Sequence, residues 1–217
     1  GEILLEELNT KIPDYRIEET KNLVSILGNE VVEEFPWANG MKPSTNDNVE
    51  GVLRRTWRPA LSIVGSDGMP STANAGNVLR PYTTLQLSMR IPPMVDPEKA
   101  VDAIEKILKD DIPYGASVEL EFEEAAEGWN APESKTWLLD AIEKASKKYF
   151  NEMPCTIGEG GTIPFMAMLG KRFPKAQFVI TGVLGPQSNA HGPNEFLHIP
   201  FAKNLTCCIS SIITDFK

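Results

Sequence analysis

The spacing of apolar residues divides the chain into helical and extended segments. Residues 17–27 and 97–108 carry apolar positions three and four apart, which predicts two amphipathic helices. Asp96 and Pro97 would start the second helix, because aspartate caps a helix amino end and proline fits the first turn. Residues 35–46 are rich in turn formers and predict a loop.

Further helices are expected near both ends of the chain. An apolar and acidic helical stretch begins at Gly1, and a helix capped by Ser134 would place its apolar side chains on one face through Ala145. Pro164 suits the first turn of another short helix. The last helix is predicted over residues 200–216.

Strands are predicted where the apolar spacing changes. Residues 81–90 and 117–123 alternate with period two, as strands do when one face of their sheet is covered. The runs at 154–157 and 177–184 are uniformly apolar, which is typical of strands buried in a parallel sheet. The fold class is therefore α/β: a two-layer α+β part beside part of a parallel-sheet domain.

Three segments follow from this pattern. Residues 1–52 form a helical segment and loop, 53–127 an α+β domain, and 128–217 part of an α/β domain. With 217 residues of which 41% are hydrophobic, the chain can bury real cores.

The composition of the chain excludes some classes of binding partner and indicates a cellular compartment. Thirty acidic and 21 basic residues give a net charge of −9, which argues against nucleic acid or an anionic membrane as partner. No apolar stretch reaches the roughly 20 residues that a transmembrane helix needs. The cysteines lack disulfide or zinc spacing, so we expect a cytoplasmic protein; a signal peptide ahead of Gly1 remains compatible with the sequence.

Two loops carry candidate chemistry. His191, one of two histidines, lies among chain-bending residues after the apolar run 177–184, where α/β sheets place their sites. The second loop, 158–165, brings glycines to a helix amino end, where backbone N–H groups and the helix dipole favour a carboxylate or oxyanion. The alternative for His191 is a histidine that only forms part of a turn. The alternative for the loop 158–165 is a turn that only leads into a helix. His198 is most simply the residue that starts the last helix.

Several motifs resemble the M20 family of metallopeptidases, in the branch of carnosinase-like dipeptidases and bacterial exopeptidases. They occur in the family's order, at residues 57–65, at 75–81 with 87–90, at 160–164 and at 189–195. The resemblance implies that 53–127 is a ferredoxin-like lid that forms homodimers, and that 128–217 belongs to the catalytic domain.

The resemblance also implies roles for individual residues. His191 matches a metal ligand, Arg90 would pair with a substrate carboxylate, and Asn77 would donate to the oxygen that becomes anionic. Substrate would further contact Gly160, Gly161 and Thr162. The alternatives are that Asn77 only forms part of a turn and that Arg90 is an ordinary surface arginine. Glu159 should contact neither metal nor substrate.

The family's other metal ligands and its glutamate base have no counterpart in this sequence. We therefore expect the carboxyl-terminal portion of a longer enzyme with two zinc ions, or manganese, that cleaves small peptides or related amides. The 217 residues alone should be inactive, with no catalytic residue of their own. Gly158 replaces an arginine that holds the substrate carboxylate in many relatives, which keeps N-acyl amino acid deacylation open. A non-catalytic dimerisation or binding module is the second hypothesis.

Overall fold

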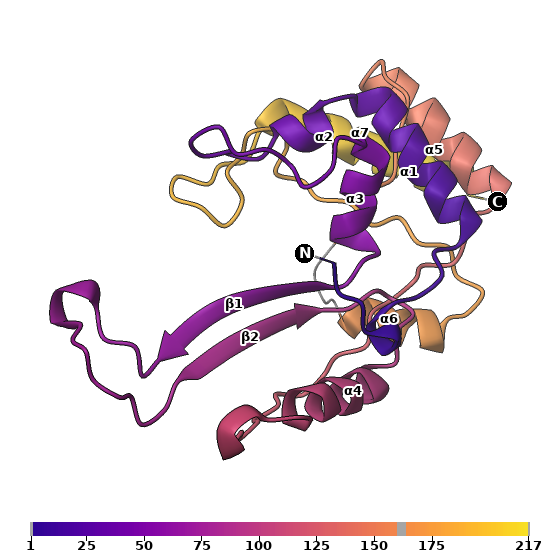
Figure 1. Ribbon diagram of the computed structural model, residues 1–217. Coiled ribbons are helices and arrows are strands. Elements are labelled where there is room, and N and C mark those ends of the chain that lie inside the picture. Colours follow the sequence, from indigo (N-terminus) through magenta and orange to yellow (C-terminus); the bar gives the residue numbers. More distant parts are fainter. Residues whose placement is uncertain (1, 160–163, 217) are drawn as a thin grey trace. The chain divides into compact units, whose positions relative to one another are not determined.

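The computed structural model describes residues 2–159 and 164–216, which fold into two compact units (Figure 1). One unit comprises Gly1–Trp129 with Ile157–Ala167, and the other comprises Asn130–Thr156 with Met168–Lys217. These units do not follow the three predicted segments one to one, because 1–52 and most of 53–127 lie in the same unit. The three-segment division stays a prediction.

The first unit opens with four helical elements. They are η1 (Glu6–Leu8), α1 (Asp14–Leu27), α2 (Glu30–Glu33) and α3 (Asn48–Thr56). Helices α1, α2 and α3 pack on one another, whereas η1 packs on the later helix α4 (Pro97–Lys109). Leu23, Val31 and Val52 form one buried cluster, which joins α1, α2 and α3. The predicted helix at 17–27 is confirmed, whereas the helical stretch expected from Gly1 is only the single turn of η1.

The amino end of α3 is fixed by a side chain. The Asp47 carboxylate accepts hydrogen bonds from the backbone N–H groups of Val49 at 2.9 Å and Glu50 at 3.4 Å. Arg54 and Arg55 in the last turn complement the negative end of the helix dipole. This helix was not among the predicted elements, although Asp47 is a residue type that commonly caps the amino end of a helix.

We expect Asp47→Ala to lower the free energy of unfolding by about 1 kcal/mol, because two backbone donors of α3 lose their acceptor. Asp47→Asn should retain most of that stability, since asparagine caps equally well. Urea unfolding of both variants measures the difference. An unchanged midpoint for Asp47→Ala would show that the cap contributes nothing to this helix.

The sheet of the first unit is a two-stranded antiparallel hairpin of β1 (Ala60–Asp67) and β2 (Thr84–Arg90). The register runs from Ala60 opposite Arg90 to Asp67 opposite Thr84, with an irregularity between Ile63 and Gly65. Almost every position of both strands is exposed. Strand β2 was predicted, but the expected covered face is wrong for the described residues, because only Met89 near the end of β2 packs in a cluster with α4.

Helix α4 (Pro97–Lys109) follows the hairpin and begins as predicted. The Asp96 carboxylate accepts from the N–H groups of Glu98 at 3.1 Å and Lys99 at 3.3 Å. The hydrogen bond from the Lys99 backbone is the main cause that holds the pKa of Asp96 below its ordinary value. Its first turn packs Ala100 against Leu8 and Val95, with Met89 of β2 beside them. Pro113–Gly115 form the short turn η3 after it.

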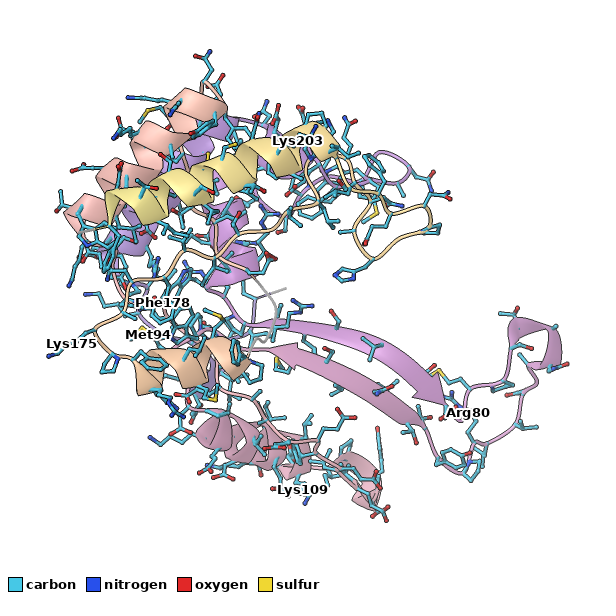
Figure 2. The ribbon with its side chains drawn as sticks, turned by 180° about the vertical axis from the view of Figure 1, so that it is seen from behind. Arg80, Met94, Lys109, Lys175, Phe178 and Lys203 are labelled. Atoms are coloured by element: carbon cyan, nitrogen blue, oxygen red, sulfur yellow. The ribbon has the colours of Figure 1, made fainter. Side chains whose placement is uncertain are left out.

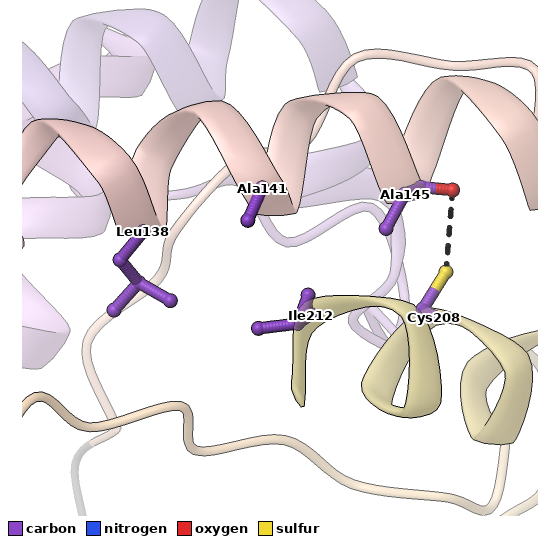
Figure 3. Close-up of a cluster of buried hydrophobic side chains, with 5 residues drawn as sticks. All are labelled: Leu138, Ala141, Ala145, Cys208 and Ile212. Carbon is purple, nitrogen blue, oxygen red and sulfur yellow. Dashed lines mark hydrogen bonds between the residues drawn. The ribbon is translucent and has the colours of Figure 1, made fainter. Parts of the chain in front are cut away.

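The second unit is built on α5 (Thr136–Tyr149) and α7 (Ile199–Asp215). Leu138, Ala141 and Ala145 of α5 pack against Cys208 and Ile212 of α7, and the Cys208 thiol donates to the Ala145 carbonyl (Figure 3). The apolar face of α5 is as predicted, but its cap is not Ser134. The residue before the helix is Lys135, whose N–H is bound instead by the Gln177 side-chain oxygen at 2.6 Å.

Three predicted strands are absent from the described residues. Segments 117–123, 155–157 and 178–184 run without helix or strand structure. A strand exists only where a second backbone supplies the ladder hydrogen bonds, so a matching side-chain pattern is not sufficient. The described residues offer these segments no such partner, and the parallel pairing inferred from the apolar runs is wrong for them.

The mixture of helices with a small sheet confirms the mixed helix and sheet fold class. Helix α6 (Pro164–Arg172) starts at the predicted proline, and α7 begins one residue before the predicted Pro200. Over the described ranges, no helix is long and apolar enough to cross a membrane.

Candidate functional site

The loop between Leu184 and His198 is closed at its base by hydrogen bonds. The His198 N–H donates to the Leu184 carbonyl at 2.7 Å, and the Phe196 N–H donates to the Ser188 carbonyl at 3.1 Å. Ser188 is buried, and its hydroxyl lies 2.9 Å from the Leu184 oxygen and 2.8 Å from the Gly185 oxygen. This loop, which we call the histidine loop, therefore has a defined stem.

Its apex is a tight turn organised by Asn189. The Asn189 side-chain amide donates to the Pro193 carbonyl at 2.6 Å. The backbone carbonyl of Asn189 accepts from the Gly192 N–H at 2.9 Å. A Cβ added at Gly192 would lie only 2.6 Å from the Asn189 side-chain nitrogen. A larger residue at position 192 would therefore have to displace the Asn189 side chain from its present place.

His191 occupies the exposed tip of this turn in the left-handed backbone conformation, at φ +61°. That conformation costs a non-glycine residue about 1–2 kcal/mol. The Glu195 carboxylate offsets part of the cost, because it accepts the His191 backbone N–H at 2.6 Å. Hydrogen bonds to charged groups contribute about 1.5–3 kcal/mol when shielded and less when exposed, as here.

The second histidine has a different role. His198 is the N-cap of α7, and its Nδ1 accepts the Phe201 N–H at 3.1 Å. Gly185 packs against this cap at φ +90°, where an added Cβ would lie 2.8 Å from the His198 Cβ. The prediction that His198 starts the helix is confirmed.

Asn77 and Arg90 are both exposed on the first unit, but they lie at opposite ends of the hairpin. Arg90 ends β2 and pairs with the first residue of β1, whereas Asn77 lies in the connection beyond the other end. Figure 2 shows Arg80, three residues from Asn77, in that far connection. A strand of seven residues spans roughly 20 Å, so one hairpin does not bring both side chains together.

The glycine-rich loop is described only in part. Gly160, Gly161 and Thr162 lie outside the described residues, so their predicted contacts stay predictions. Glu159 is exposed. A Cβ built on Gly158 would lie 3.1 Å from the Thr56 Cβ, so a larger side chain at position 158 would require Thr56 to shift by a few tenths of an ångström.

The metal chemistry of the described residues is limited to single donors. Within residues 2–159 and 164–216, no three His, Cys, Asp or Glu side chains gather as a metal site. His191 fits a zinc ligand, because its imidazole is exposed at a loop tip and the described contacts engage only its backbone. Burial raises the pKa of the Cys208 thiol, and desolvation raises that of Cys155, which disfavours the thiolates that bind metal.

Glu195 is the residue of this site whose role sequence reasoning missed. It belonged to the matched motif without an assigned function. Its spacing of four from His191, across a Gly-Pro-Asn turn, was the available signal. Such a signal identifies a turn but not which backbone group the carboxylate accepts.

Comparison with known proteins relates this chain to dipeptidases. The chain is 30% identical over 156 residues to the cysteinylglycine-S-conjugate dipeptidase of Corynebacterium striatum, a match to 67% of this chain and 33% of that protein. It is 31% identical over 142 residues to the Cys-Gly metallodipeptidase DUG1 of Saccharomyces cerevisiae, covering 61% and 28%. No family model matches the sequence.

Among solved structures, the M20 family metallo-carboxypeptidase Sso-CP2 of Sulfolobus solfataricus is similar with a TM-score of 0.73 at 16% identity. That match covers 96% of this chain and 46% of the other. The homologues and structural neighbours are thus M20-family dipeptidases and carboxypeptidases, which confirms the resemblance. The chain spans about a third of the length of the curated relatives that it matches.

Proposed function

We propose that this chain forms the lid and the carboxyl-terminal segment of a dinuclear, zinc-dependent hydrolase that cleaves small peptides. The observation that carries the proposal is the histidine loop, which presents an imidazole at its tip in a chain related to metal-dependent dipeptidases. The remaining ligands and the general base would come from a region outside these 217 residues. This explains why the described residues gather no metal-binding group.

In this proposal, each site residue has a distinct task. His191 holds one ion through its neutral imidazole, and bound zinc supplies Lewis-acid activation of the scissile carbonyl and of water. Arg90 pairs with the free carboxylate of the substrate, and Asn77 donates to the carbonyl oxygen as it gains charge. The loop at Gly160, Gly161 and Thr162 presents backbone and hydroxyl groups to the substrate.

The separation of Asn77 from Arg90 supports a homodimer through the lid. A dipeptide extends about 7 Å, whereas the strand between these side chains spans roughly 20 Å. Both can contact one small substrate only if they come from two copies of the chain. Zinc is the proposed ion, with manganese as the alternative, and the free cysteines favour the cytoplasm.

The substrate class is a dipeptide or a similarly small amide with a free carboxylate. The relatives' names describe cleavage of cysteinylglycine conjugates and of Cys-Gly, which favours small dipeptides. N-acyl amino acids, which carry the same free carboxylate, are the alternative substrates. A non-catalytic dimerisation module is the second candidate, favoured by the lack of a metal-binding group among the described residues.

These proposals predict that the 217-residue chain alone hydrolyses no dipeptide, even with added zinc or manganese, because one ligand without a general base cannot activate water. The complete protein should hydrolyse dipeptides and lose that activity to a chelator. Parallel assays on the two proteins, with metal analysis, measure this. Turnover by the 217-residue chain that a chelator abolishes would overturn the proposed division of the site.

A further inference from the structure

The histidine loop contains a carboxylate that contacts the backbone of His191 rather than its ring. Glu195 Oε2 lies 2.6 Å from the His191 nitrogen, and the Glu195 N–H in turn donates to the Gly192 carbonyl at 3.3 Å. The two residues are thus held across the Gly192-Pro193-Asn194 turn. His191, directly before that turn, and Asn194, its last residue, both have positive φ, at 61° and 60°.

This geometry matters because the left-handed conformation sets the direction of the imidazole. A histidine whose backbone relaxed to the ordinary β or helical region would turn its Cβ away from the present tip. The stem hydrogen bonds of Leu184, Ser188 and Phe196 hold the base of the loop, but they do not touch the His191 backbone. Among the described contacts, the Glu195 carboxylate is the one that binds it.

We propose that Glu195 is a positioning residue for the metal site. Its carboxylate holds the His191 backbone in the left-handed conformation, so that the imidazole is presented to the ion without prior rearrangement of the loop. This inference rests on the proposed function, because it takes His191 as a metal ligand. Glu195 itself acts on the backbone and does not contact the ion.

The test compares Glu195→Ala with Glu195→Gln in the complete protein. Zn²⁺ affinity is measured by competition with a chromophoric chelator, and loop order by hydrogen exchange of the peptide that contains His191. Glu195→Ala should weaken Zn²⁺ binding on the order of 10-fold and accelerate exchange of that peptide. Glu195→Gln keeps an acceptor oxygen and should restore most of both properties.

Two controls separate positioning from general destabilisation and from failure of the metal role. Asp47→Ala removes a carboxylate cap far along the chain and should leave Zn²⁺ affinity unchanged. His191→Ala should weaken Zn²⁺ binding further than Glu195→Ala, because it removes the ligand itself.

Each contrary outcome overturns a different statement. If His191→Ala weakens binding but Glu195→Ala does not, the positioning role is wrong and the proposed function stands. If Glu195→Gln loses as much affinity as Glu195→Ala while exchange stays slow, Glu195 is a direct ligand instead. If His191→Ala binds Zn²⁺ normally, the metal role of the loop fails, and the positioning role fails with it.

Discussion

In the complete protein, His191→Ala should reduce hydrolysis of a dipeptide by at least about 10³-fold, because an ion with a missing ligand is lost or loses the geometry that activates water. The variant should also contain less zinc after dialysis. The fold should be retained, since the imidazole is exposed and the loop stem is bound by Leu184, Ser188 and Phe196. Activity and metal content measured on the same preparations test both statements.

The matched control is the other histidine. His198→Asn replaces a helix cap by another good cap, so it should keep α7, the metal and the activity. If His198→Asn loses zinc as strongly as His191→Ala, then the loop responds to any disturbance and His191 has no special role. Excess zinc that restores full activity to His191→Ala would show that the imidazole only tightens binding.

Arg90→Ala should lower kcat/KM for a dipeptide by roughly 10- to 150-fold, because it removes a charge-assisted contact worth about 1.5–3 kcal/mol. Lysine should rescue only part, since it cannot form the two parallel hydrogen bonds of a guanidinium with a carboxylate. The melting temperature should change little, because Arg90 is exposed at the end of β2.

A carboxy-amidated dipeptide distinguishes carboxylate recognition from other roles of Arg90. The natural protein should prefer the free carboxylate, and Arg90→Ala should lose that preference. Arg58→Ala, which breaks only the ion pair with Glu50, serves as the charge-matched control and should keep the preference. Equal losses on both substrates in Arg90→Ala would replace carboxylate recognition by a structural or oxyanion role.

Local signals predicted α1, α4, α5, α6 and α7, but they did not lead to a prediction of α2 or α3. Asp96 lies directly before Pro97, and both caps and apolar spacing act within a few residues. Ser134 shows the limit of that reasoning, because α5 begins at Thr136 and the residue directly before it is Lys135. The Lys135 N–H is bound by Gln177, 42 residues along the chain.

The strands and the site were predicted less completely, for a related reason. Segment 178–184 has the composition of a buried strand, but pairing depends on a distant backbone that no local pattern specifies. The sequence motif assigned a role to His191, which stays a prediction, but none to Glu195, because the contact of Glu195 is with a backbone N–H. The distance between Asn77 and Arg90 follows only from the hairpin register, which sets which residues meet at each end.

The length of the hairpin has a consequence for how the enzyme would respond to dilution. Since Asn77 and Arg90 lie at opposite ends of one β1–β2 hairpin, a site that uses both requires two copies of the chain. By mass action, specific activity would then fall when the protein concentration drops below the dissociation constant of the dimer. Mixing the impaired Asn77→Ala variant with the impaired Arg90→Ala variant would restore part of the activity, because one of the two sites in a mixed dimer would receive both unmutated side chains.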